Sequence, residues 1–117
     1  MMDAHIHHQG SSRQPTPLQV ELAATAWARL RGLLGRRGLN LGQGLWIRPC
    51  NSVHCCFMRF AIDVLYLDSA GTILRVRHHL RPWRFSAYWR AASVLELAAG
   101  ECRRLNIQPG DRLQCNA

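Results

Sequence analysis

The chain has 117 residues, a length typical of one domain. Hydrophobic residues make up 48% of it, which is enough for one core and too much for a disordered chain. No run of residues approaches the roughly 18 apolar residues that span a membrane. The net charge is +8, and all 15 basic residues are arginine. Arginine suits phosphate and carboxylate ligands, but a complete absence of lysine is better explained by codon usage than by a binding site.

Residues 1–17 lack the apolar segment of a secretory signal and are expected to form a flexible polar leader. Loose metal binding by His5, His7 and His8 is the less favoured alternative. Residues 18–117 are expected to form a single β-rich domain. The five cysteines fit neither a C-x-x-C pair nor a disulfide framework, so we expect reduced thiols, no metal and a cytoplasmic protein.

The first predicted elements follow the leader. Alternation over Leu18–Leu22 predicts a short strand. Apolar residues at helical spacing over 27–34 predict a helix that ends at Gly35. A further strand is predicted over 45–49. The apolar run Ile62–Asp68 and the alternating run 72–80 flank a turn, which predicts a hairpin.

The second half of the chain is predicted to contain mostly strands. Pro82 and the loss of alternation predict a loop over 81–93. A strand over 94–97, one or two helical turns after it and a closing strand over 112–115 complete the chain. Because strands follow one another with few helices between them, antiparallel pairing is expected. The predicted fold class is mainly β (α+β): a single compact antiparallel β-barrel-like or jelly-roll-like domain with one or two short helices.

Three segments at defined spacing carry a family pattern: RLRGLLGRRGL (29–39), VHCCFMRFAIDVLYLDSAGTIL (53–74) and VLELAAGECRRLNIQPGD (94–111). The matching positions are Gly32, Leu33, Leu34, Arg36, His54, Phe57, Met58, Arg59, Phe60, Ile62, Asp63, Asp68, Leu95, Glu96, Leu97, Ala99 and Gly100. In order and spacing the chain resembles the domain of unknown function 192 family. Cys55, Cys56 and Ala61 depart from its pattern. The resemblance implies a small β-rich domain with a barrel-like or jelly-roll-like sheet and no established activity.

The His54-Cys55-Cys56 run is the first candidate site. Adjacent residues on a strand point to opposite faces, so only His54 and Cys56 could share one. Two ligands fall short of the four that a structural zinc site needs. A Cys-His nucleophile would also need a third group to orient the imidazole. We therefore expect a packed strand here.

Two acidic residues, Asp63 and Glu96, lie within apolar strands. A buried carboxylate is costly unless it is paired. Structural ion pairs are one explanation, with Arg36, Arg48 or Arg59 as partners of Asp63, and backbone caps in neighbouring loops are another. The functional alternative is that the two carboxylates converge with His54 on a cleft and carry out hydrolase-like acid-base chemistry. We favour the structural explanation.

The segment Arg75–Arg90 combines five arginines with four aromatic residues, namely Trp83, Phe85, Tyr88 and Trp89. Such a surface can bind single-stranded nucleic acid by stacking and phosphate contact, or an anionic membrane. The preferred interpretation is that the aromatic side chains cover the open end of a barrel. Nucleic acid or another polyanion is the second hypothesis.

The sequence favours a binding protein over an enzyme, because it contains no recognisable catalytic nucleophile or set of metal ligands. The first hypothesis is a small ligand or a peptide in a cleft near His54, Met58, Asp63 and Glu96. Nearby arginines favour an anionic group on that ligand, and the candidates are Arg36, Arg48 and Arg59. No cofactor is expected.

Overall fold

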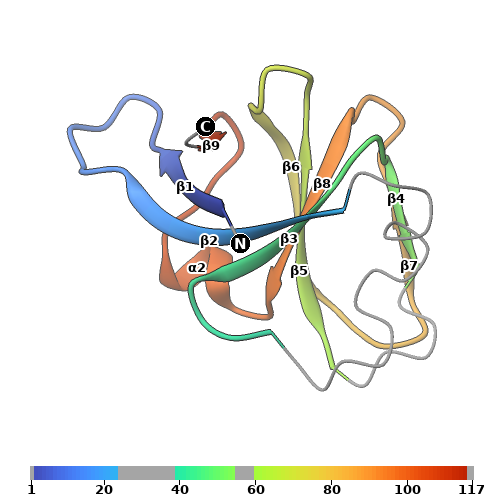
Figure 1. Cartoon of the computed structure of the whole chain (residues 1–117). Helices are drawn as coiled ribbons and strands as arrows, with labels where there is room; N and C mark the ends of the chain where they lie inside the picture. Colours follow the sequence, from blue (N-terminus) through green and yellow to red (C-terminus); the bar gives the residue numbers. More distant parts are fainter. Residues whose placement is uncertain (1, 24–38, 55–59, 116–117) are drawn as a thin grey trace.

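The computed structural model describes residues 2–23, 39–54 and 60–115 of the chain. A curled β-sheet dominates this part, with a two-stranded ribbon and one short helix beside it (Figure 1). The elements are β1 (Met2–His7), β2 (Thr16–Ala23), β3 (Gln43–Ile47), β4 (Ser52–His54), β5 (Ile62–Leu67), β6 (Ile73–Leu80), β7 (Phe85–Ala87), β8 (Ser93–Ala98), α2 (Glu101–Arg104) and β9 (Arg112–Cys115). The predicted mainly β class is confirmed. The helix predicted over 27–34 lies outside the described residues.

The main sheet has seven strands in the order β6-β5-β8-β3-β2-β1-β9. Neighbouring strands are antiparallel except β2 and β3, which are parallel. The parallel pair differs from the antiparallel sheet that the sequence predicts. It is feasible because the connection, residues 24–42, exceeds the dozen or so residues that a parallel crossover needs. The predicted hairpin of β5 and β6 is confirmed.

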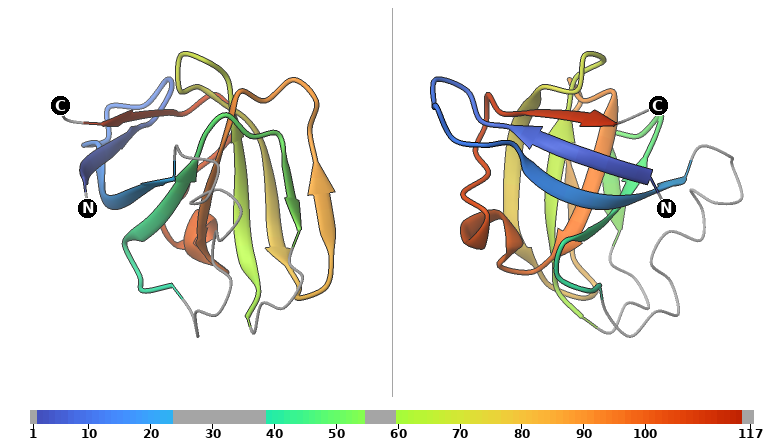
Figure 2. Two further views of the ribbon diagram at one scale, coloured as in Figure 1. Left: turned by 45° about the vertical axis from the view of Figure 1, so that its right-hand side comes forward. Right: turned by 60° about the vertical axis from the view of Figure 1, so that its left-hand side comes forward.

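The sheet curls until its two ends touch at one point, which gives the half-barrel shown in both views of Figure 2. Thr72, just before β6, forms a bridge with Arg112 of β9. The N–H of Leu113 donates to the carbonyl of Gly71 at 2.9 Å. Gly71 has a φ of 87°, and a Cβ there would lie 2.5 Å from the Leu113 oxygen. Glycine therefore permits both the turn and the close approach.

The central strands are buried on both faces, so the core has two parts. Side chains alternate between the faces of a strand, and β5 and β8 contribute to each part. The first core is Ala4, Ile6, Leu18, Val20, Leu65, Leu67, Ile73, Leu95, Leu97, Cys102, Ile107 and Leu113. The second core is Ala23, Leu45, Ile47, Ile62, Val64, Tyr66, Leu80 and Val94. Burial on both faces explains why these strands appear as continuous apolar runs in the sequence.

Strand β1 differs from the flexible leader expected for residues 1–17. It pairs with β2 on one side and β9 on the other. Ala4 and Ile6 are buried in the first core, while Asp3 and His7 are exposed. This alternation is the signature of a half-buried strand. Because residues 1–17 are mostly polar, the sequence analysis did not predict this strand.

The ribbon of β4 and β7 packs on the face of the second core. Its register pairs Ser52 with Ala87 and His54 with Phe85. The hydroxyl of Tyr66 in β5 donates to the Ser86 Oγ of β7 at 2.6 Å, which fixes the ribbon to the sheet. The loop predicted over 81–93 therefore contains a short strand.

Candidate functional site

Asp63 of β5 is fully buried, and backbone groups surround its carboxylate. Oδ1 accepts a hydrogen bond from the N–H of His79 at 2.9 Å. Oδ2 accepts from the N–H groups of Gly100 at 3.1 Å and Cys102 at 3.0 Å. Of the two structural explanations that the sequence left open, the structure shows backbone capping. Asp63 thereby joins β6 and the start of α2 to the centre of the sheet.

Glu96 of β8 is also buried, but on the other face of the sheet. Asp63 is paired with Leu97 of the first core, whereas Glu96 is paired with Val64 of the second. The two carboxylates therefore point away from each other and do not meet in one cleft. His54 belongs to β4, in the ribbon. The hydrolase-like site hypothesised for these three residues therefore lacks the two converging carboxylates on which it depends.

The remaining predicted site residues divide into two groups. Arg36, Met58 and Arg59 lie outside the described residues, and so do Cys55 and Cys56. Arg48 follows β3, and its guanidinium carbon lies 4.4 Å from the centre of the Trp46 ring. This is a cation–π contact, which also holds the arginine in place.

Of the described cysteines, Cys102 is buried, and Cys50 and Cys115 are partly buried. Burial is the main cause that raises the pKa of the Cys102 thiol, and the nearby Asp63 carboxylate adds to it. A thiol of this kind is a poor nucleophile, because the thiolate is the reactive form. Within residues 2–23, 39–54 and 60–115, no three His, Cys, Asp or Glu side chains are grouped to hold a metal ion. No helix in the same ranges is long and apolar enough to cross a membrane.

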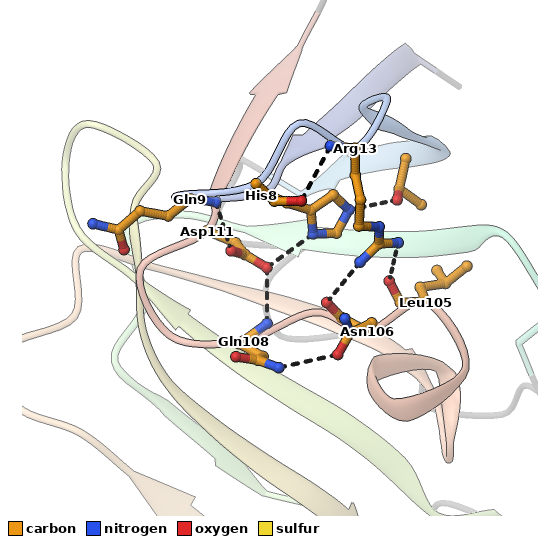
Figure 3. A network of polar contacts seen from close by, with 9 residues as sticks. His8, Gln9, Arg13, Leu105, Asn106, Gln108 and Asp111 are labelled. Carbon is orange, nitrogen blue, oxygen red and sulfur yellow. Dashed lines mark hydrogen bonds and ion pairs between the residues drawn. The ribbon is translucent and has the colours of Figure 1, made fainter.

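A polar network missed by the sequence analysis joins the N-terminal segment to the end of the chain (Figure 3). The His8 ring contacts Asp111 Oδ2 at 3.1 Å through Nδ1 and Thr16 Oγ1 at 2.6 Å through Nε2. Asp111 also accepts hydrogen bonds from the N–H groups of Gln9 and Gln108. The only signal in the sequence is Asp111 at the end of a Pro-Gly turn, where aspartate commonly binds backbone N–H groups.

The Thr16-His8-Asp111 order has the form of a nucleophile, a base and an orienting carboxylate. The three side chains are nearly buried: Thr16 is 8% exposed, and the His8 and Asp111 side chains are 4% and 7% exposed. Asp111 is already committed to two backbone N–H groups. We therefore assign the network to anchoring residues 8–16 against the turn before β9.

Glu101 forms a second anchor, at the start of α2. It is 1% exposed, accepts from Arg104 Nε at 2.5 Å, and accepts from the N–H of Gly42 at 2.9 Å. The hydrogen bond from Arg104 is the main cause that lowers the pKa of Glu101, and burial opposes it. The charged carboxylate thus holds α2 to the loop before β3.

The segment Arg75–Arg90 forms an exposed cationic face, called here the basic face. All five of its arginines are exposed, and no acidic residue occurs between Asp68 and Glu96. A pocket of about 390 Å³ on this face is lined by four basic side chains, Arg77, His79, Arg81 and Arg84. The three arginines of this lining create a favourable potential for anions.

The aromatic residues of the basic face do not lie as the sequence analysis expected, namely over the open end of a barrel. Trp83, Phe85 and Trp89 are 64%, 58% and 81% exposed, so they do not cover a core. Tyr88 is the exception, because it packs against the second core and lies 5.9 Å from the Tyr66 ring. The physical reason lies in β7, where side chains alternate: Ser86 points toward Tyr66, and Phe85 consequently points outward.

Trp83 has an unusual backbone conformation, with a φ of 67°. The turn Arg81–Arg84 is closed by a hydrogen bond from the Arg84 N–H to the Arg81 carbonyl at 3.2 Å. Pro82 and Trp83 occupy its two central positions, and a positive φ at the second is the mark of a type II turn, where glycine or asparagine is normal. A bulky residue in this conformation costs about 1–3 kcal/mol. The turn therefore presents an exposed indole between two arginines at the expense of stability.

A second pocket, called here the end pocket, lies where β3 and β5 end and β8 begins. Its volume is about 430 Å³, and its polar lining consists of Trp46, Arg48, Asp68, Ser69 and Ser93. Trp46 Nε1 donates to Ser93 Oγ at 2.9 Å. Asp68 Oδ1 accepts from the N–H groups of Ala70 and Thr72, both at 2.9 Å. Unlike the basic face, this pocket combines one cation with one carboxylate.

Together the described residues define a small β half-barrel domain with a basic, aromatic face and a separate small pocket. The chain belongs to the DUF192 family, described as "Uncharacterized ACR, COG1430", whose model matches residues 6–115. The family resemblance seen in the sequence is thus confirmed.

Curated relatives of this family occur in archaea. The UPF0127 protein PF1050 of Pyrococcus furiosus is 41% identical over 103 residues, which cover 85% of this chain and 88% of the relative. A UPF0127 protein of Thermococcus sibiricus is 32% identical over 101 residues, 81% of this chain. The chain spans only 64% of the length of that second relative.

Two solved structures share the fold. A protein from Sinorhizobium meliloti 1021, described as a "putative transcription regulator", superposes with a TM-score of 0.89 at 27% identity and covers 97% of this chain and 92% of its own. A protein of unknown function from Novosphingobium aromaticivorans gives a TM-score of 0.81 at 19% identity, with coverage of 96% and 83%. The second likeness concerns the fold alone.

Proposed function

We propose that the protein binds single-stranded nucleic acid through the basic face. The observation that carries the proposal is the pocket of four basic side chains, Arg77, His79, Arg81 and Arg84, with exposed aromatic residues beside it in the chain. Arginine donates to phosphate oxygens through a planar fork and keeps its charge at all physiological pH values. The pocket can therefore accept one or more phosphates of a polyanion.

The aromatic side chains supply the second half of recognition. Trp83 lies between Arg81 and Arg84 in the chain, and Phe85 follows directly. Stacking of one base on an aromatic side chain contributes about 1–3 kcal/mol and tolerates any base. The Trp83 indole is 64% exposed in a turn of fixed conformation, and a stacked base would benefit from that fixed position.

A single strand fits this surface better than a duplex. In a duplex the bases are already stacked on one another, so exposed indoles would find no partner face. Among the described residues, the only helix is α2, which has four residues and is too short to read a major groove. An unpaired strand offers both phosphates and base faces to the same surface.

One comparison supports this proposal. The Sinorhizobium meliloti protein carries a name that places it in transcription, and it is 27% identical to this chain. That name describes the other protein, and for this chain it adds weight to nucleic acid over other polyanions. Codon usage accounts for arginine in place of lysine throughout the chain, but it does not explain why Arg77, Arg81 and Arg84 line one pocket.

The test is a titration of labelled 12-nucleotide single strands, as DNA and as RNA, against the full chain at two salt concentrations. Three or four phosphate contacts on a single strand give a log-log salt slope of roughly −2 to −3. Arg77→Ala together with Arg81→Ala should lower that slope. Arg103→Ala is the matched control, because it removes an exposed charge from α2, outside the basic face.

The aromatic contribution needs a variant that keeps the fold. Trp83→Gly suits the positive φ of the turn, so its melting temperature should hold or rise while affinity falls by about 1–3 kcal/mol. Leu41→Ala is the control for loss of an exposed apolar side chain, since Leu41 is 67% exposed and lies outside the face. Equal affinity of wild type and Trp83→Gly would reject the stacking. Heparin or anionic lipid vesicles binding more tightly than the oligonucleotides would reject nucleic acid as the partner.

A further inference from the structure

The pocket of the basic face, called here the arginine pocket, is built from one short stretch of chain. Arg77 and His79 belong to β6, and Arg81 and Arg84 stand at the two ends of the turn that follows it. The hydrogen bond from the Arg84 N–H to the Arg81 carbonyl closes this turn, so the chain reverses direction and returns Arg84 to the vicinity of Arg81. Four basic side chains thereby line one volume of about 390 Å³.

The backbone that carries the arginine pocket is fixed from the core. The pairing of β5 with β6 shifts register at Asp63, which lies opposite both His78 and His79 in a β-bulge. His79 has a φ of 52°, and its N–H donates to Asp63 Oδ1 at 2.9 Å. A bulge re-aims side chains and is common beside functional sites. The buried carboxylate thus fixes the backbone conformation from which His79 lines the pocket.

Within the part of the chain that the structure describes, the four side chains of the arginine pocket have no acidic partner. None of them forms an ion pair or a side-chain hydrogen bond there, and all three arginines are exposed. Three neighbouring guanidinium groups repel one another, and an anion bound between them removes that repulsion. The charge of the pocket is therefore left for a ligand to neutralise.

The number of guanidinium groups indicates which kind of phosphate fits. An internal phosphodiester carries one negative charge and two free oxygens, whereas a terminal phosphate monoester carries a charge of about −1.5 to −2 at pH 7 and three free oxygens. Each guanidinium donates through a planar fork, so Arg77, Arg81 and Arg84 together can bind all three oxygens. A terminal phosphate also has a sugar on one side only, so it can enter a pocket end-on, whereas a diester must bring the chain in and out again.

We propose that the arginine pocket holds the terminal phosphate monoester of a single strand. The inference rests on the proposed nucleic-acid binding and adds that the basic face selects phosphorylated strand ends over strand interiors. Two successive diesters bring a similar charge, but their oxygens lie on separate groups, and the sugar between them must also enter the pocket. His79 adds a ring N–H donor beside the three guanidinium groups.

The test is a titration of the full chain with labelled 12-nucleotide single strands that differ only at their ends: hydroxyl at both ends, a 5′-phosphate, or a 3′-phosphate. A 14-nucleotide strand with hydroxyl ends is the probe for charge alone, because its two additional diesters match the charge of the terminal phosphate. We expect a phosphate at one end to tighten binding at least about fivefold, the effect of one additional charge at contact distance in water, while the 14-nucleotide strand gains less than about twofold. The end whose phosphate gives the gain is the end that enters the pocket.

Two pocket variants locate the effect. Arg84→Gln keeps the backbone hydrogen bond of the turn and should reduce the gain from the terminal phosphate to less than about twofold. Arg81→Gln should do the same, and it serves if Arg84→Gln disturbs the turn. Arg90→Gln, which removes an exposed charge of the basic face outside the pocket, is the matched control and should keep the gain while all strands bind somewhat more weakly.

The outcomes separate this inference from the proposed function. Salt-dependent binding of every strand with no gain at either end, or with an equal gain for the 14-nucleotide strand, overturns the inference alone. A gain that both Arg81→Gln and Arg84→Gln retain also overturns it, because the terminal phosphate then lies elsewhere. Absence of binding by all strands overturns the inference and the proposed function together.

Discussion

Replacement of Asp63 by alanine is expected to destabilise the protein strongly. The carboxylate is fully buried and accepts three backbone hydrogen bonds, from His79, Gly100 and Cys102. Each buried N–H left without an acceptor costs about 1–3 kcal/mol, so three set an upper bound of about 9 kcal/mol, and the loss is smaller because the His79 and Gly100 hydrogen bonds are only part-buried. A water molecule can enter the space left by the carboxylate and recover part of this. We therefore expect a loss of about 3–5 kcal/mol in the free energy of unfolding.

Urea unfolding monitored by circular dichroism measures this loss as a lower midpoint at an unchanged m value. For a chain of this size, each kcal/mol corresponds to about 4 °C, so the melting temperature should fall by about 12–20 °C. Asp63→Asn keeps one acceptor oxygen, so its stability should lie between that of the wild type and that of Asp63→Ala. Asp3→Ala, an exposed carboxylate on β1, is the control and should change stability by less than about 0.5 kcal/mol. A loss below about 1 kcal/mol for Asp63→Ala would refute the capping role.

Three further predictions concern the other buried groups. The lowered pKa of Glu101 means that its contribution is complete above its ordinary pKa of 4.5 and is lost as pH falls through the folded value, so Glu101→Gln should flatten the acid side of a stability-pH profile, and an unchanged profile would contradict this. His8→Ala removes two hydrogen bonds and should cost about 2–3 kcal/mol in a urea melt, and a loss under about 0.5 kcal/mol would leave the network without a stabilising role. Cys102 should resist iodoacetamide in the native protein and react once it is unfolded, as mass spectrometry can show; rapid native labelling would mean that α2 opens readily.

Local patterns predicted those elements whose neighbours are close in sequence. The β5–β6 hairpin follows from two apolar or alternating runs around Asp68 and a turn, and β8 and α2 follow from similar signals. The parallel pairing of β2 with β3 could not be predicted, because it depends on a crossover of residues 24–42. Strand β1 was missed because its partners, β2 and β9, bury only two of its apolar side chains.

The site was less accessible to sequence reasoning than the fold. The partners of Asp63 are backbone N–H groups, and the residue types in a sequence do not indicate which backbone groups will bind a carboxylate. The separation of Asp63 from Glu96 follows from the register that places Val64 opposite Glu96, and a register cannot be obtained from composition. Exposure of Phe85 depends on which way β7 faces, and the Tyr66–Ser86 contact decides that. Exposure of Trp83 depends on the turn Arg81–Arg84, in which Trp83 has a positive φ.

The pairing of β1 with β9 has a consequence for how the protein is made. The paired residues Ala4 and Cys115, and likewise Ile6 and Leu113, are more than a hundred positions apart in the chain. While the ribosome synthesises the intervening strands, β1 has one edge with unsatisfied backbone groups and two apolar side chains awaiting a cover. The sheet can be completed only after β9 has left the ribosomal exit tunnel. A nascent chain stalled before residue 112 should therefore remain sensitive to protease within β1, whereas the complete, released chain, which contains β9, should lack that sensitivity.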